Sequence, residues 1–209
     1  MIHTIAFASC YVYSPGGTGA VCERSRLLRA LLKEGDAHFL IKYAARVHQL
    51  AEESAQLAGF FHATDLLVPV PGSTPKPAGS AWVAADLADA LVREGLGTSA
   101  WPGLHRIHAV RKSATAAPGT RPTVARHYES FEMQRSRLTP PSVVLIDDVI
   151  TKGRTLLAAA ARVHEAFPDA QVRAFAMLRT MGLSSGVQQL LDPCQGEIRW
   201  KGGDAYRRP

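Results

Sequence analysis

Residues 143–155 have the sequence VVLIDDVITKGRT, which predicts the central strand and the ligand site of the fold. The leading apolar residues are mostly β-branched, which is typical of a short strand buried on both faces in a parallel sheet. Two adjacent carboxylates, Asp147 and Asp148, close this expected strand. A polar loop follows, and apolar residues then recur at helical spacing over 156–167. The pattern predicts a strand, an acid pair, a loop and a helix in direct succession.

The loop between the acids and the helix has the composition of a phosphate site. Ligands of open α/β sheets bind beyond the carboxyl ends of the strands. The first amides of a helix, together with the helix dipole, form an anion-binding site. A glycine in the loop allows close backbone approach, and its hydroxyls and cations add donors and charge. The two acids repel a bare phosphate but suit ribose hydroxyls and an Mg²⁺ ion that shares them. The expected phosphate-binding residues are Thr151, Lys152, Gly153, Arg154 and Thr155.

This stretch resembles the 5-phosphoribosyl-1-pyrophosphate (PRPP) binding motif of the type I phosphoribosyltransferases, a hydrophobic strand followed by two acids and a short Thr/Gly loop. The resemblance implies an α/β fold, with an open parallel sheet flanked by helices and a small hood from the chain ends. It also implies that Asp147 and Asp148 contact the ribose 2′- and 3′-hydroxyls and that the loop 151–155 wraps the 5′-phosphate. The glycine spacings of a P-loop and of a dinucleotide fingerprint are both absent from the stretch.

A second strand followed by a polar loop is predicted at residues 65–74, DLLVPVPGST. Proline has no amide donor, so the prolines mark the end of regular strand pairing. A helix with inward-facing apolar residues is expected over 80–94. In type I phosphoribosyltransferases the loop after this strand holds pyrophosphate through backbone amides. The resemblance therefore implies a pyrophosphate site at Gly72, Ser73 and Thr74.

The positive charge of the chain is concentrated between residues 104 and 138. The formal net charge is +6, and this segment carries seven cations against two acids, an excess of five. Its natural partner is a polyanion, either PRPP or a nucleic acid, and a solvated basic loop without a ligand is the alternative. The small, polar stretch 112–122 is expected to be mobile. The family has a loop here that closes over PRPP, which implies pyrophosphate contacts from Arg111, Lys112 and Arg121.

Hydrophobic periodicity and breaker residues predict the other elements. A helix over 21–33 is expected to turn Leu27, Leu28, Leu31 and Leu32 inward. Further expected elements are a strand at 2–13, a helix at 39–60, a hairpin of 104–111 with 123–133, a parallel strand at 171–178 and, in a loop-rich C-terminal region, a short strand at 197–200.

The chain of 209 residues is expected to form one domain, with a core over 63–180 and a hood built from 1–62 and 181–209. The segment 13–71 is similar to the ComF/GntX-like branch of the family, through LKEGD at the end of a helix and VPVP at the end of a strand. Two features of that branch are missing. The three cysteines have no zinc-ribbon spacing, and PAGS stands in place of an Arg-Gly-Phe-Asn stretch.

The resemblance implies an Mg²⁺-dependent phosphoribosyltransferase that transfers ribose 5-phosphate from PRPP to a small nitrogenous acceptor and releases pyrophosphate. Asp147 and Asp148 would be its catalytic acids, and Mg²⁺ would arrive with PRPP beside them. The alternatives are a non-catalytic protein that senses PRPP or a nucleotide, and a ComF-like protein associated with DNA handling. A homodimer is one expected state. A cytoplasmic location without a membrane partner is expected, because no signal peptide is recognisable and no apolar run approaches ~18 residues.

Overall fold

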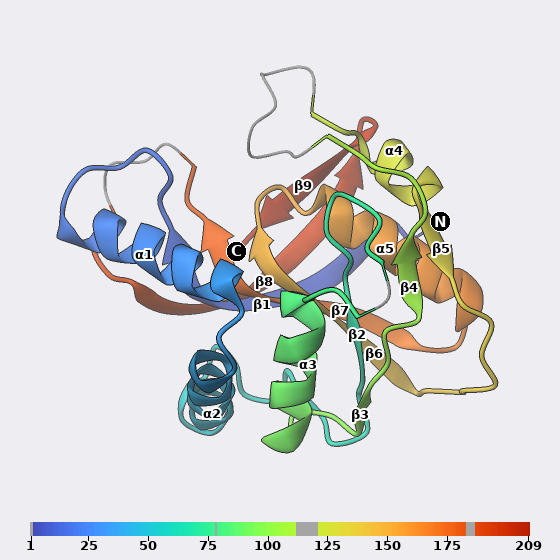
Figure 1. Cartoon of the computed structure of the whole chain (residues 1–209), viewed down its shortest axis with the longest axis horizontal. Helices are drawn as coiled ribbons and strands as arrows, with labels where there is room; N and C mark the ends of the chain where they lie inside the picture. Colours follow the sequence, from blue (N-terminus) through green and yellow to red (C-terminus); the bar gives the residue numbers. More distant parts are fainter. Residues whose placement is uncertain (1, 78, 112–120, 183–186) are drawn as a thin grey trace.

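A seven-stranded sheet runs through the protein in the computed structural model, which describes residues 2–77, 79–111, 121–182 and 187–209 (Figure 1). In spatial order its strands are β3 (Ser99–Ala100), β2 (Leu66–Pro69), β6 (Ser142–Ile150), β7 (Gln171–Thr180), β1 (Thr4–Tyr13), β8 (Leu191–Lys201) and β9 (Asp204–Arg208). A separate sheet pairs β4 (Leu104–Arg106) with β5 (Phe131–Met133). The helices are α1 (Ala20–Glu34), α2 (Ala37–Glu53), α3 (Val83–Arg93), α4 (Val124–Glu129) and α5 (Arg154–Ala166).

The strands from β3 to β1 are parallel, whereas β8 and β9 run antiparallel to their neighbours. The predicted α/β class is therefore confirmed, and the sheet is mostly parallel, with β8 and β9 as its antiparallel strands. β8 pairs directly with β1 in the reverse direction, and β9 returns beside β8 through Gly202 and Gly203, whose φ angles are 58° and 84°. Two glycines with positive φ suit the tight turn of a hairpin.

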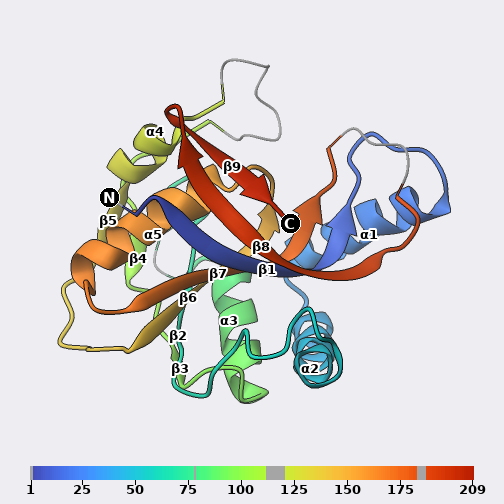
Figure 2. The ribbon, with the colours of Figure 1, turned by 180° about the vertical axis from the view of Figure 1, so that it is seen from behind.

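Both chain ends contribute strands to the main sheet, and the division into a core over 63–180 and a hood from 1–62 and 181–209 stays a prediction. β1 lies between β7 and β8, and β8 and β9 extend the same sheet (Figure 2). The physical reason is the apolar composition of β7, which is buried from Val172 to Arg179. An unpaired apolar strand would expose a full edge of backbone donors and acceptors, and β1 covers that edge.

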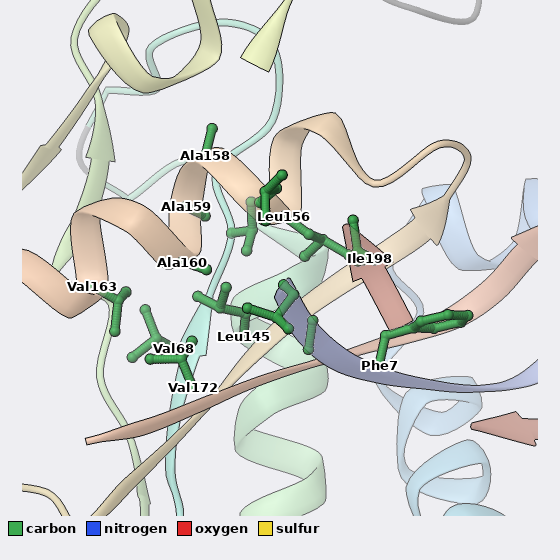
Figure 3. Packing of buried hydrophobic residues seen from close by; sticks show 14 of the residues in the cluster. Phe7, Val68, Leu145, Leu156, Ala158, Ala159, Ala160, Val163, Val172 and Ile198 are labelled. Carbon is green, nitrogen blue, oxygen red and sulfur yellow. The ribbon is translucent and has the colours of Figure 1, made fainter. Parts of the chain in front are cut away.

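Helices cover both faces of the sheet (Figures 1 and 2). On one face, α2 and α3 bury Leu40, Val47 and Leu87 against Leu67 and Ile146 of the central strands. On the other face, α5 packs its apolar side on the same strands, as expected from the spacing of its residues. Figure 3 shows Ala160 and Val163 of α5 on the side of the helix that faces Leu145 of β6 and Val172 of β7. The small alanine side chains allow α5 to lie close to the sheet.

Some element boundaries differ from the prediction for local reasons. α2 ends at Glu53 and turns follow it, although Leu57 and Phe60 remain buried. The segment expected to be a strand over 123–133 begins as α4, because Thr123 accepts a hydrogen bond from the amide of Arg126 at 3.2 Å and caps the helix. Leu27, expected to face inward, is 61% exposed, whereas Leu32 of the same helix is fully buried.

Candidate functional site

The carboxyl ends of four neighbouring parallel strands, β2, β6, β7 and β1, open into one cavity of about 410 Å³. Its walls include Gly72 and Ser73 after β2, the acid pair of β6, Thr151 of the following loop, Thr155 in the first turn of α5, Thr180 at the end of β7 and Tyr13 at the end of β1. α1 adds Arg29 and Lys33 to the same cavity. This is the edge of the sheet at which open α/β proteins bind their ligands.

The acid pair lies inside β6, which continues through both residues to Ile150. The amide of Asp148 donates to Asp147 Oδ1 at 2.8 Å, and the amide of Val149 donates to Asp148 Oδ1 at 2.8 Å. Lys33, from the last turn of α1, forms an ion pair with Asp148. Asp148 is therefore neutralised by a cation that is distant in the sequence, whereas Asp147 faces the cavity and has no ion pair with any described residue.

The two acids have opposite pKa shifts. Burial and the neighbouring charge of Asp148 raise the pKa of Asp147 well above its ordinary value. Burial acts to raise the pKa of Asp148, but the charge and hydrogen bond of Lys33, together with hydrogen bonds from Asp147 and the Val149 amide, lower it below its ordinary value. The pair therefore carries its first negative charge on Asp148, and Asp147 holds its proton to higher pH.

The raised pKa of Asp147 makes the site a source of instability at neutral pH. In the folded protein Asp147 binds its proton at pH values where the unfolded chain has released it, so stability falls as pH rises above the ordinary aspartate value of 3.8. Replacing Asp147 by Asn should increase the free energy of unfolding at pH 7.5 by about 1 kcal/mol, and the gain should shrink toward pH 4. Urea unfolding at both pH values measures this difference. A variant as stable as the wild type, or less stable, at pH 7.5 would contradict it.

The expected phosphate loop surrounds a small hollow of about 30 Å³ next to the larger cavity. Its walls include Arg121, Asp147 and every residue from 151 to 155. Gly153 is the residue before α5 and has a φ angle of +85°, and a Cβ atom at this position would lie 2.7 Å from Ile198 Cγ2. Both the backbone conformation and the close approach of β8 require glycine here.

The two cations of this loop are held by an acid from the C-terminal hairpin. Arg154 makes a bidentate pair with Asp204, in which Nη2 lies 2.6 Å from Oδ2, and its Nη1 donates to the Pro122 carbonyl at 3.2 Å. Lys152 Nζ lies 3.6 Å from the same carboxylate. The side-chain charge of Lys152 and Arg154 is thus partly compensated by Asp204, which the sequence did not indicate. The hydrogen bonds to Asp204 raise the pKa of Arg154 and lower that of Asp204.

The predicted pyrophosphate loop is held in place by Arg106, a residue buried to 5% exposure. Its guanidinium donates to the carbonyls of Gly72 and Pro71, the latter at 3.3 Å, and to Ser130 Oγ. Burial lowers the pKa of Arg106 to about 10, opposed by the charge of Asp147, so the group stays cationic at neutral pH. Gly72 and Ser73 line the cavity, whereas Thr74 is not among its lining residues.

The loop expected to carry cations to pyrophosphate is only partly described. Arg111 is exposed and lines the large cavity, and Arg121 lines the small hollow. Lys112 lies outside the described residues. Because Arg106 is buried and Arg111 and Arg121 border the two cavities, the charge excess of this segment is directed in part toward the candidate site.

His127 is a further lining residue without any signal in the sequence. His127 lies in α4 and its side chain is 3% exposed, with Nε2 at 3.5 Å from the hydroxyl oxygen of Thr155. Burial, with the charges of Arg106 and Arg154, lowers the pKa of His127 to about 4, so the imidazole is neutral at physiological pH. Among the described residues its Nδ1 has no hydrogen-bond partner. It borders the phosphate loop and is available to position Thr155.

The donor set at the acid pair suits an Mg²⁺ ion that is shared with a ligand. Mg²⁺ is commonly held by one or two carboxylates together with substrate phosphates and water. Asp147 and Asp148 offer such oxygens in the cavity, and no cluster of three or more potential metal ligands occurs in the part of the chain that the structure describes. These two carboxylates alone do not provide a full set of protein ligands for a metal ion.

No protein-family model matches the chain, and no curated protein matches it. Within the described ranges, each helix is too short or too polar to cross a membrane. The fold and the site together define an α/β protein with a mostly parallel sheet and a polar ligand cavity at the carboxyl ends of its central strands.

Proposed function

We propose that this protein is an Mg²⁺-dependent phosphoribosyltransferase, which binds PRPP in the cavity at the ends of β2 and β6 and transfers its ribose 5-phosphate to a nitrogenous acceptor. The observation that carries the proposal is the convergence of two separate loops on one cavity. Gly72 and Ser73 reach it from β2, and Asp147, Thr151 and Thr155 reach it from β6. A sugar that is phosphorylated at both ends needs an anion site on each side of a carboxylate pair.

In this proposal each group of the chain has a defined task. The amides and hydroxyls of the loop 151–155 hold the 5′-phosphate at the N-terminus of α5. Asp147 and Asp148 accept hydrogen bonds from the ribose hydroxyls. The amides after β2, with Arg111 beside them, hold the pyrophosphate. These contacts fix the ribose so that its C1′ is presented to the acceptor in one orientation.

The reaction itself breaks the bond between C1′ and the pyrophosphate oxygen, and the electron pair leaves with pyrophosphate. The acceptor nitrogen donates its lone pair to the opposite face of C1′ and loses its proton to solvent. Asp147 and Asp148 favour the positive charge that develops on the ribose. Asp147 and Asp148 would hold an Mg²⁺ ion, which would supply positive charge for the departing pyrophosphate.

Calorimetric titration of PRPP, with Mg²⁺ and with EDTA in its place, tests the proposal. We expect saturable binding that requires Mg²⁺, and weaker binding of ribose 5-phosphate because it lacks the pyrophosphate. Pyrophosphate release is then measured after addition of a panel of nitrogenous bases. Absence of PRPP binding by folded protein overturns the proposal. Binding without release with any base would instead identify a protein that senses PRPP.

A further inference from the structure

The part of the cavity beyond the acid pair is formed by the ends of β7 and β1 and by one face of α1. Tyr13 and Thr180 close the two strands there, and Arg29 and Lys33 reach the same wall from α1. Arg29 and Lys33 are one helical turn apart, so both side chains project from the same face of the helix. No role in holding PRPP falls to Tyr13, Arg29 or Thr180 in the function proposed above.

The order of the strands determines what this wall faces. The sheet places β2, β6, β7 and β1 side by side, with all of their carboxyl ends at the same edge. If the ribose is held at β6 and pyrophosphate leaves toward the loop after β2, the opposite face of C1′ points toward β7 and β1. A nucleophile that displaces pyrophosphate must approach from that opposite face.

The wall carries positive charge that the described residues do not neutralise fully. Lys33 pairs with Asp148, whereas Arg29 has no ion pair or hydrogen bond with any described residue. The Arg29 guanidinium lies over the ring of Tyr13, with its carbon 5.2 Å from the ring centroid, which holds the group at the cavity surface. Next to it, the Thr180 hydroxyl oxygen is buried without a hydrogen-bond partner among the described residues.

We propose that this wall is the acceptor site and that the acceptor is a small planar nitrogen compound bearing a carboxylate, which Arg29 binds. The proposal rests on the function proposed above. A guanidinium presents a fork of donors that matches a carboxylate. The Thr180 hydroxyl supplies a donor or acceptor for a polar ring atom, and the Tyr13 ring supplies an apolar surface. The cavity of about 410 Å³ has to hold PRPP as well, which favours a small acceptor.

Two matched pairs of probes test the class of acceptor: orotate with uracil, and nicotinate with nicotinamide, each a carboxylate compound and a neutral analogue. Pyrophosphate release is measured with PRPP and Mg²⁺ for the wild type and for Arg29→Gln, Arg29→Lys and Arg24→Gln. Arg24 is the matched control, because it is an exposed arginine of the same helix that does not line the cavity. PRPP binding to each variant is measured by calorimetry in parallel.

We expect the wild type to use the carboxylate member of at least one pair in preference to its neutral analogue. Arg29→Gln should lose about tenfold to 100-fold of the rate with that probe, Arg29→Lys should keep part of it, and Arg24→Gln should match the wild type. PRPP affinity should be the same in all four proteins. Failure to bind PRPP at all would overturn the proposed function. With PRPP bound, the absence of a carboxylate preference overturns this inference alone, as does a loss of PRPP affinity in Arg29→Gln.

Discussion

Replacement of both acids of β6, Asp147→Asn with Asp148→Asn, should weaken the binding of PRPP in the presence of Mg²⁺ by about 100-fold or more. Hydrogen bonds to a charged group contribute about 1.5–3 kcal/mol each. The double variant removes the carboxylate acceptors of the hydrogen bonds from the ribose hydroxyls. It also removes the oxygens that would share Mg²⁺ with the ligand. Lys33 loses its ionic partner at little cost, because its side chain is 51% exposed and can be solvated.

The decisive measurement is calorimetric titration of the double variant beside a matched control, Asp86→Asn with Asp89→Asn. The control removes the same number of charges from exposed positions of α3 that do not line the cavity. We expect the control to bind as the wild type does. Unfolding curves should show that the double variant at β6 is folded, since Asn at Asp147 removes a destabilising buried acid. Unchanged PRPP affinity in a folded double variant would exclude the acid pair as the ribose site.

The centre of the fold could be predicted from the sequence because its signals are local. A run of β-branched residues ends in two acids, and a glycine and a helical apolar pattern follow. These signals within residues 143–167 predicted a strand, a loop and a helix, and the structure has β6, a loop and α5 there. The C-terminal hairpin was not predicted, because β8 contains Pro193 and Gly196 and has the mixed polarity of a strand near the edge of a sheet. Gly202 and Gly203 between two strand-like segments were the available signal for that hairpin.

The loops of the candidate site were also predictable, since each directly follows an apolar strand. The residues that complete the site were not. Lys33, Arg106 and His127 come from three elements distant in the sequence, and only the topology of the chain brings them to the cavity. Compensation of the loop cations by Asp204 depends in the same way on β9 lying next to the loop. Side-chain pairing across the fold has no periodicity that a sequence pattern could reveal.

The amino-terminal ends of the parallel strands contain the interaction on which stability should depend most. Asp65 is fully buried just before β2, where its Oδ1 accepts from Arg173 Nη2 of β7 at 2.6 Å and from the Ser142 hydroxyl of β6. The amide of His62 donates to its other oxygen at 2.8 Å. One buried carboxylate therefore connects three neighbouring strands at their amino ends, far from the cavity at their carboxyl ends.

Replacing Arg173 by Met should lower the free energy of unfolding by about 3–5 kcal/mol, because it leaves the Asp65 carboxylate buried without the guanidinium that pairs with it. This is a large share of the ~5–15 kcal/mol that stabilises a typical protein. The exposed pair of Arg199 and Glu197 provides the contrast, and Arg199→Met should cost less than about 1 kcal/mol. Urea midpoints at constant slope measure both effects.

A double variant separates the loss of the ion pair from a general disturbance of packing. Adding Asp65→Asn to Arg173→Met removes the unpaired charge, so it should recover part of the lost stability. If the double variant is less stable than Arg173→Met, the cost lies in packing and hydrogen bonds rather than in the unpaired carboxylate. PRPP affinity per folded molecule should be unchanged in both variants, because the network contributes no residue to the cavity. The stabilising network would then be assigned to the amino-terminal ends of the parallel strands, and ligand binding to their carboxyl-terminal ends.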